Sequence, residues 1–346
     1  MTVEKALFVS DIKDNQEVNS LFLVKTMRLS ETRVGKPFLA LDLMDRTGEL
    51  VGRVWDGAER LAVQCPAGSV VRVTGQAQVY KGALQLKITE LEKVAAEDVD
   101  WTHFLPTTPY DIEAMADEVI VLIKGLPDKE IQRLLMSVVK DHPLWKAFTT
   151  APAAKSMHHA YIGGLLEHSL GICRLADRVC ALYPSINRSL LIAGAILHDL
   201  GKVREFSFAV PPFDYSDQGR LLGHMVISLE ILQEKLAALR DFPERTAMMI
   251  KHLVISHHGR YEFGSPALPM IREAFVLNFI DDLDAKMNYL DRLSRQVAPT
   301  DYQWTEYQRT MERFMFVTGH AAQADGENGP GSASDDEAGQ RQPSLW

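Results

Sequence analysis

Cysteine, long apolar runs and basic charge are all scarce in this chain of 346 residues. Its three cysteines, Cys65, Cys173 and Cys180, have neither CxxC spacing nor the even number of a disulfide framework, which favours a reducing compartment. No run of about 18 apolar residues occurs, so we expect no transmembrane helix and no membrane partner. The N-terminus MTVEKALFVSDIKD is charged where a signal peptide needs apolar residues. A cytoplasmic location is therefore expected.

The net charge of −9 at first argues against a nucleic-acid partner, but the charge is unevenly distributed. Residues 1–95 contain 13 Lys and Arg against 12 Asp and Glu, so the acidity lies in the remainder. Part of that acidity would be neutralised if carboxylates there bind cations. The N-terminal segment is thus the least acidic part, although it is not strongly basic.

The first 95 residues have the pattern of a small β domain. Apolar and polar residues alternate in five strand-like runs, at residues 18–32, 37–45, 49–56, 68–80 and 83–94, with Gly75 as a bulge or bend. Residues 56–64 could form a short helix between the third and fourth runs. This order predicts a five-stranded OB-fold barrel over residues 1–95, with another small barrel or sandwich as the alternative.

After a linker at residues 96–110, which contains Pro106 and Pro109, the pattern becomes helical. We predict a helical domain over residues 111–318, with helices at 112–124, 128–141, 158–182, 189–198, 224–238, 244–256 and 270–295. Residues 203–223 are too irregular for a helix. Residues 319–346 are rich in Gly, Ala, Ser, Asp and Gln and are expected to be disordered.

Histidines and aspartates recur through the helical part at the spacing of one helix plus its connection. His168, His198, His224, His257 and Asp281 are separated by 30, 26, 33 and 24 residues. Asp199 follows His198 directly, and His258 follows His257. A single histidine is more often structural, but successive helices of a bundle can direct such a set at one centre. Imidazole and carboxylate are ligands for divalent metals, so the set predicts a metal site.

The order His168, His198–Asp199 and Asp281 resembles the H…HD…D signature of the HD-domain superfamily. His224 and His257–His258 resemble the longer form found in members that bind two metals. The whole of residues 5–315, with an OB-like part and the segment HHAYIGGLLEHSL, is similar to the YhaM family of bacterial 3′→5′ exoribonucleases. This resemblance implies an all-helical HD bundle that binds divalent metals and cleaves phosphoesters.

The resemblance also implies roles for individual residues. His168, His198, Asp199 and Asp281 match the core metal ligands, and Asp199 would bridge two metals. His224 and one or both of His257 and His258 match ligands of a second metal. Asp281 is preferred because FIDDLDAK aligns with the family pattern; Asp284 would lie behind the ligands or on the surface, and Asp282 would be exposed.

Lys202, after the HD pair, could contact a substrate phosphate or stabilise the leaving group; a solvent-exposed lysine at a helix end is the alternative. His158 and His159 could contact phosphate at the site entrance or simply cap and pack a helix. Gly163 and Gly164 weaken the helical pattern there and favour close packing near the metals.

Three further residues are candidates for substrate binding. Trp55 and Tyr80 lie near strand ends of the barrel and could stack on bases, although a barrel core also needs aromatics. Arg220 could reach a phosphate or be a solvated loop residue.

We therefore predict a metal-dependent 3′→5′ exonuclease that hydrolyses single-stranded RNA, with DNA left open. Two divalent ions are expected, Mn²⁺ first, while Fe, Co, Ni and Zn suit the ligands about as well. One alternative is a nucleotide or cyclic-dinucleotide phosphodiesterase, but His258 is followed by GRYEFG and no GYP triplet. A non-catalytic nucleic-acid-binding adaptor is another. The sequence carries no indication of an oligomeric state.

Overall fold

The structure, a computed structural model, describes residues 4–32, 35–80, 82–95, 98–154, 159–207, 214–295 and 297–319. The predicted tail after Gly319 and the candidate His158 lie outside these residues. The chain forms two compact units, Met1–Tyr289 and Leu290–Trp346, which are described separately. Over the described ranges, no helix has both the length and the apolar character that crossing a membrane requires.

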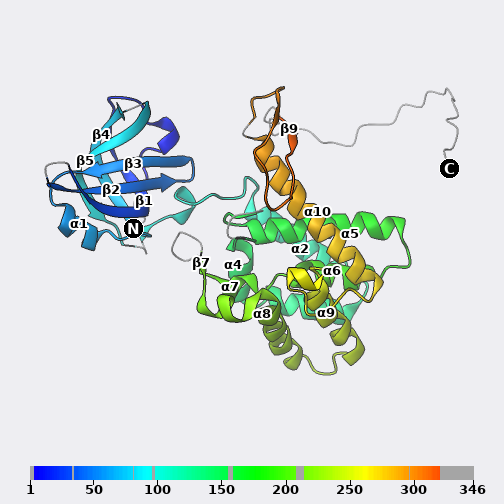
Figure 1. The fold of residues 1–346 in the computed structure, drawn as a ribbon. Coiled ribbons are helices and arrows are strands. Elements are labelled where there is room, and N and C mark those ends of the chain that lie inside the picture. Colours follow the sequence, from blue (N-terminus) through cyan, green and yellow to red (C-terminus); the bar gives the residue numbers. More distant parts are fainter. Residues whose placement is uncertain are drawn as a thin grey trace. The chain divides into compact units, whose positions relative to one another are not determined.

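The first part of unit 1 is a closed five-stranded barrel (Figure 1), which confirms the OB-fold prediction. After the short 3₁₀ helix η1 (Val9–Asp11), the elements are β1 (Glu17–Glu31), β2 (Pro37–Asp45), β3 (Gly48–Val54), α1 (Ala58–Gln64), β4 (Val70–Tyr80) and β5 (Ala83–Lys93). The strand order is β1-β2-β3-β5-β4, and β3 pairs with β5 in parallel. Alternate residues of β2 point into a core that includes Phe22, Val73 and Leu86.

Gly75 marks an irregularity in β4, because the register with β5 shifts between Thr74 and Gly75. A Cβ at Gly75 would lie 2.3 Å from the carbonyl oxygen of Lys87. The two strands therefore approach more closely here than any side chain would allow.

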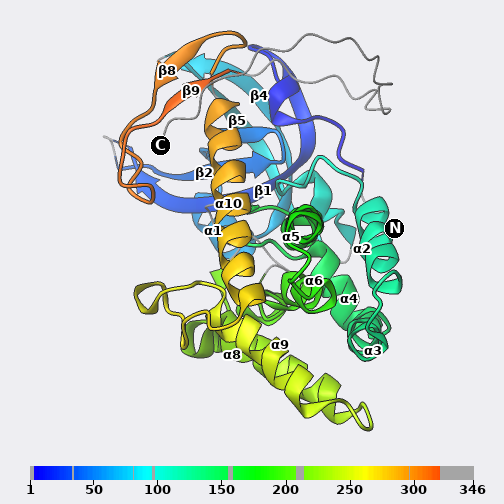
Figure 2. The same ribbon diagram turned by 90° about the vertical axis from the view of Figure 1, so that its right-hand side faces the viewer.

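The second part of unit 1 is helical. Its helices are η3 (Trp101–His103), α2 (Ile112–Lys124), α3 (Lys129–Val139), α4 (His142–Thr150), α5 (Gly164–Leu182), α6 (Arg188–Leu197), α7 (Lys202–Glu205), α8 (Asp217–Ala237), α9 (Glu244–Ser256), η4 (Tyr261–Phe263) and α10 (Arg272–Ser294). Asp111, Asp128 and Asp141 cap α2, α3 and α4 through backbone N–H groups. Helix α6, seen beside α5 in Figure 2, is buried from Ser189 to Leu197 and forms the middle of the core.

Two helices begin six or seven residues away from their predicted starts. Helix α5 begins at Gly164, later than predicted, because Gly163 has φ +80° and His159 has φ +45°, which no α-helix accommodates. Helix α8 begins at Asp217 within the segment predicted to be irregular, and Gly223 (φ 72°) interrupts it just before His224. Helix α4 was not predicted.

Beyond the end of α10, unit 2 contains a hairpin and not the predicted helical continuation to residue 318. Strand β8 (Tyr302–Trp304) pairs antiparallel with β9 (Phe316–Thr318), and the rings of Tyr302 and Phe316 stack at 5.9 Å. In β8, Gln303 separates the two aromatic residues Tyr302 and Trp304. A second small pair, β6 (Phe206–Ser207) with β7 (Asp214–Tyr215), lies between α7 and α8.

Candidate metal centre

The predicted ligands converge on one site from five helices of unit 1. His168 comes from the second turn of α5, and His198 and Asp199 come from the end of α6. His224 follows the break in α8, His257 and His258 end α9, and Asp281 lies on α10. All seven residues that were predicted as metal ligands are therefore brought together.

One group of ligand atoms lies deep in the bundle. His168 Nε2 is 3.2 Å from Asp281 Oδ1 and 3.4 Å from His198 Nε2. Asp199 Oδ2 is 3.7 Å from His168 Nε2 and 3.4 Å from His198 Nε2. The imidazoles of His168 and His198 are fully buried. Four ligands around a common point are what a divalent cation needs.

A second group lies next to the first and shares Asp199. Its other oxygen, Oδ1, is 3.4 Å from His224 Nε2 and 3.7 Å from His257 Nε2. His258 completes a cluster with His224 and His257 in which one nitrogen from each lies within 4.8 Å of the others. Among the described residues, Asp199 Oδ1, His224 Nε2 and His257 Nε2 are buried atoms without a hydrogen-bond partner. Burying unpaired polar atoms is costly, so their convergence makes this second group a candidate cation site.

The five histidines share one orientation. Each Nδ1 faces an acceptor: Asp284 Oδ2 at 2.7 Å for His168, Ala195 O at 3.0 Å for His198, Glu205 Oε1 at 3.1 Å for His224, Val254 O at 2.7 Å for His257 and Phe263 O at 2.8 Å for His258. An acceptor at Nδ1 holds the proton there and leaves the Nε2 lone pair for a metal. Five imidazoles whose Nε2 atoms can act as ligands suit a site for divalent metals.

Two of these acceptors are side chains that orient the ligands. Asp284, left undecided from the sequence, lies directly behind His168. Glu205 was missed by the sequence reasoning, although it closely follows the HD motif; its Oε1 also accepts the backbone N–H of His224 at 3.0 Å. Its position six residues after Asp199 could have indicated it.

Lys202 lies inside the site and not at a solvated helix end. Its Nζ is 2.5 Å from Asp199 Oδ2, and the side chain is buried. Burial would raise the pKa of Asp199, but Lys202 and His198 outweigh burial and hold that pKa well below its usual value. Asp199 is therefore ionised and ready to bind cations.

The pKa of His168 is shifted in the opposite direction from the pKa values of His257 and His258. Burial would lower the pKa of His168, but hydrogen bonds to Asp281 and Asp284 raise it to about 9. Burial, followed by repulsion from His198 and His258, lowers the pKa of His257 well below its ordinary value. Burial and repulsion from His224 likewise lower the pKa of His258. His257 and His258 are therefore neutral, as ligands must be, near neutral pH.

The other candidates of the helical part lie elsewhere. His159 is 4% exposed and its Nε2 is 3.0 Å from Asp284, so it packs behind His168, as the packing alternative expected. Arg220 is exposed on α8, where it donates to Asp214 Oδ1 at 3.0 Å and lies over the ring of Tyr215. It is therefore a surface residue near the start of α8.

On the barrel, Trp55 belongs to an aromatic pair. Its ring stacks on Phe38 at 4.9 Å, and Arg53 lies 5.4 Å over Phe38. Neither Trp55 nor Phe38 is buried in the barrel core. Tyr80, at the end of β4, is 55% exposed. Both predicted stacking residues thus lie on the barrel surface.

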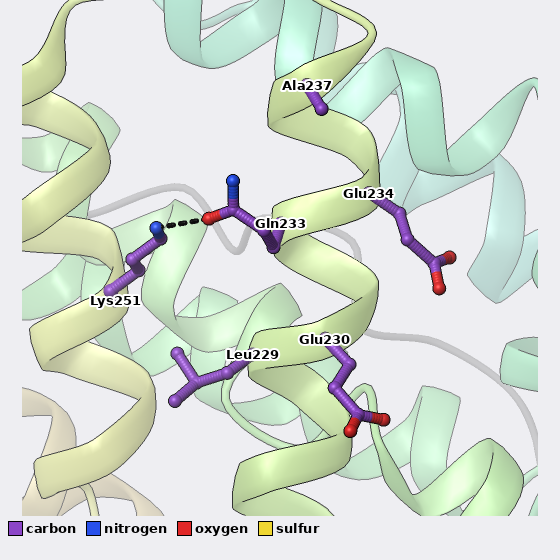
Figure 3. A pocket seen from close by; sticks show the side chains of 6 residues that line it. All are labelled: Leu229, Glu230, Gln233, Glu234, Ala237 and Lys251. Atoms are coloured by element: carbon purple, nitrogen blue, oxygen red, sulfur yellow. Dashed lines mark hydrogen bonds between the residues drawn. The ribbon is translucent and has the colours of Figure 1, made fainter.

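A groove elsewhere on the bundle does not belong to this centre. It runs between α8 and α9, and Figure 3 shows its lining of Leu229, Glu230, Gln233, Glu234, Ala237 and Lys251. Lys251 donates to Gln233 across it. None of the predicted ligands lines it, so the groove has no part in the metal chemistry.

Comparison with known proteins agrees with this arrangement. Residues 165–286 match the family described as "HD domain", and residues 23–94 match the family described as "OB-fold nucleic acid binding domain". The protein named 3'-5' exoribonuclease YhaM of Bacillus subtilis is 38% identical over 83% of this chain and 90% of that protein. The YhaM protein of Listeria monocytogenes is 36% identical over 87% of this chain and 94% of its own length.

Proposed function

The chain belongs to the YhaM family of 3′-5′ exoribonucleases, and we propose that it removes nucleotides from the 3′ end of single-stranded RNA with two divalent ions, preferably Mn²⁺. The observation that carries the proposal is the common orientation of the five histidines: each Nδ1 faces an acceptor, and in His168, His198, His224 and His257 the Nε2 atom lies near Asp199 or Asp281.

The ligands divide naturally between two ions. His168, His198 and Asp281 would hold one ion, and His224, His257 and His258 would hold the other. Asp199 offers one oxygen to each group. Two divalent ions lower the pKa of a bound water and stabilise the charge that develops in an in-line displacement at phosphorus.

The protein contributes orientation and charge to this reaction. Asp284 and Glu205 fix the rings of His168 and His224, so the ligands need little rearrangement. Lys202 places a buried positive charge beside the carboxylate of Asp199. The same charge offsets the negative charge of a substrate phosphate that binds there. The bundle therefore supplies a preorganised site for an anionic ester.

The barrel supports a strand as the substrate. Phe38 and Trp55 form a surface aromatic platform beside Arg53. Aromatic rings with basic neighbours bind single strands without strict sequence preference. A hydrolase of mononucleotides would not need such a platform.

A strand assay tests the proposal. The full chain is incubated with 5′-labelled single-stranded RNA and Mn²⁺, and a ladder that shortens steadily from the 3′ end is expected. An RNA whose 3′ end is blocked by ligation into a circle should resist. The Asp199→Ala variant, prepared in parallel, controls for contaminating nucleases.

Other outcomes would overturn the proposal. Faster turnover of mononucleotides or cyclic dinucleotides than of RNA would indicate a small-nucleotide phosphodiesterase. Tight strand binding without cleavage under any divalent metal would indicate an adaptor. A matched DNA strand cut faster than RNA would change the proposed substrate.

A further inference from the structure

Asp284, which orients His168, is itself held from behind by His159. Asp284 Oδ2 lies 2.7 Å from His168 Nδ1 and 3.0 Å from His159 Nε2, so two imidazoles share one carboxylate oxygen. The backbone N–H of His159 donates to Asn288 Oδ1 at 2.9 Å, and its φ of +45° is unusual for a residue other than glycine. His159 is thus fixed at both backbone and side chain.

The contacts continue away from the metal ligands. Tyr161 Oη lies 2.9 Å from His159 Nδ1 and donates to Glu167 Oε1 at 3.0 Å. Thr108 Oγ1 donates to Glu167 Oε2 at 2.5 Å. Thr108 belongs to the segment between β5 and α2, and its backbone N–H also donates to Ile162 O at 2.9 Å. An unbroken series of side chains therefore joins this connecting segment to His168.

Three glycines leave the space that these hydrogen-bonded residues occupy. A Cβ at Gly164 would lie 2.0 Å from the carbonyl oxygen of His159, and one at Gly171 would lie 2.6 Å from Asp284 Oδ1. A Cβ at Gly163, which has φ +80°, would lie 2.8 Å from Thr108 Cγ2. Side chains at these positions would displace the series, so its geometry is built into the fold.

Asp284 needs this restraint because it borders a pocket. Residues Tyr110, Glu118, His159, Glu167, Arg174 and Asp284 are among those that line the pocket. A carboxylate at such an edge can turn towards water, and His168 would then lose the acceptor that directs its ring. The hydrogen bond from His159 opposes that rotation.

We propose that Thr108, Glu167, Tyr161 and His159 form a positioning series that acts through Asp284 to fix His168. His159 is its central positioning residue, and Thr108 is the point at which the segment from the barrel is tied to the metal centre. The inference rests on the proposed role of His168 as a metal ligand.

Mn²⁺ binding by the full chain tests the series, measured from the electron paramagnetic resonance signal of free Mn²⁺. His159→Leu removes the donor to Asp284 and should weaken binding of the ion held by His168, by up to the roughly 10–100-fold that is typical when a residue in direct contact with a ligand is removed. His159→Gln retains a side-chain N–H and should recover most of the affinity. Tyr161→Phe keeps the ring and should weaken binding less than His159→Leu.

Activity and stability measurements separate positioning from general damage. His159→Leu should lower kcat on RNA while KM changes less than twofold, and the urea midpoint of the metal-free protein should stay near that of the parent. Tyr183→Phe, at the exposed end of α5, is the matched control and should change none of these values. If His159→Leu fails to fold, His159→Gln and Tyr161→Phe carry the comparison, since both preserve shape.

The inference is overturned if His159→Leu binds Mn²⁺ as the parent does, or if the Gln variant is no better than the Leu variant. Failure of the proposed function looks different. In that case the parent binds Mn²⁺ and the His159 variants still bind it more weakly, but no RNA is cut. Cleavage by the parent with unchanged metal affinity across the series would reject the positioning role alone.

Discussion

Asp284 Oδ2 lies 2.7 Å from Nδ1 of His168, and this contact joins a residue on α10 to a candidate metal ligand on α5. Burial would raise the pKa of Asp284, but hydrogen bonds from His159 and His168 hold it well below its usual range. The carboxylate is therefore a permanent acceptor that fixes the tautomer of His168.

The Asp284→Asn variant should weaken Mn²⁺ binding about 10–100-fold, because an amide oxygen is a poorer acceptor and the amide N–H₂ can face His168 instead. Isothermal titration calorimetry gives the affinity. Asp282→Asn, two residues earlier, changes an exposed aspartate that pairs with Lys286 and is the matched control. Equal affinities in the two variants would contradict the orienting role.

Asp199→Asn should reduce RNA cleavage by more than the roughly 10–100-fold expected for a residue that only orients a ligand. Asp199 lies within reach of both groups of histidines, so one substitution affects both. Metal analysis of the purified variant should show loss of bound ion at both positions. Retention of one full equivalent with parental activity would count against the bridging geometry.

Metal binding at the deeper group should strengthen as pH rises from about 7 to 8. The pKa of His168 is raised to about 9, so at neutral pH the ring carries a second proton, on Nε2, and this proton must leave when a cation binds there. One linked proton gives about a tenfold change in affinity per pH unit. Calorimetry in buffers of different ionisation enthalpy should record release of about one proton at pH 7.

His257 and His258 should contribute no such dependence over this range. The pKa values of His257 and His258 are lowered, so both are already neutral. In the Asp281→Asn variant, which damages the deeper group, the remaining Mn²⁺ binding should be the same at about pH 7 and 8. A tenfold rise there would contradict the assignment.

Gly171→Ala should destabilise the protein by about 1–3 kcal/mol, because the new Cβ would overlap Asp284. Urea unfolding of the metal-free protein measures the change. Gly125→Ala is the control, since its Cβ would meet only backbone oxygens at 3.5 Å and its φ is −79°. If both variants had a similar free energy of unfolding, Asp284 would be able to move aside for the new Cβ without destabilising the protein.

Trp55→Ala should weaken binding of single-stranded RNA by about 1–3 kcal/mol, the value of one base stacked on an aromatic ring. Fluorescence anisotropy in the presence of EDTA measures binding without cleavage. Val63→Ala, on the exposed side of α1, is the control. Unchanged affinity in Trp55→Ala would place the strand on another surface of the barrel, such as that near Tyr80.

Local patterns predicted most of the fold because they are set by neighbouring residues. Helix α2 matches its predicted range, since Asp111 caps its first turn and Gly125 follows its last. The start of α5 was predicted too early because its helical pattern includes His159, whose φ is fixed by distant partners such as Asn288. Tertiary contacts of that kind leave no periodic trace.

The same distinction holds in the metal centre. The seven candidate ligands, which the structure brings together, were predicted from their spacing and type, since chemistry restricts which residues can bind a cation. Glu205 was missed and Asp284 left undecided, because an orienting carboxylate is recognised only by what it touches. The hairpin of β8 and β9 was missed because strands of three residues are too short for a clear period.

The contact between Lys202 and Asp199 affects how the metal-free protein folds. The ammonium group gives the buried carboxylate a counter-charge of its own, and the bundle around it has an extensive apolar core. Folding therefore does not have to wait for a cation, unlike in domains where the metal is the core. The metal ions can therefore be removed and rebound while the chain stays folded. Chelation should abolish RNA cleavage, and adding the divalent metal back should restore it.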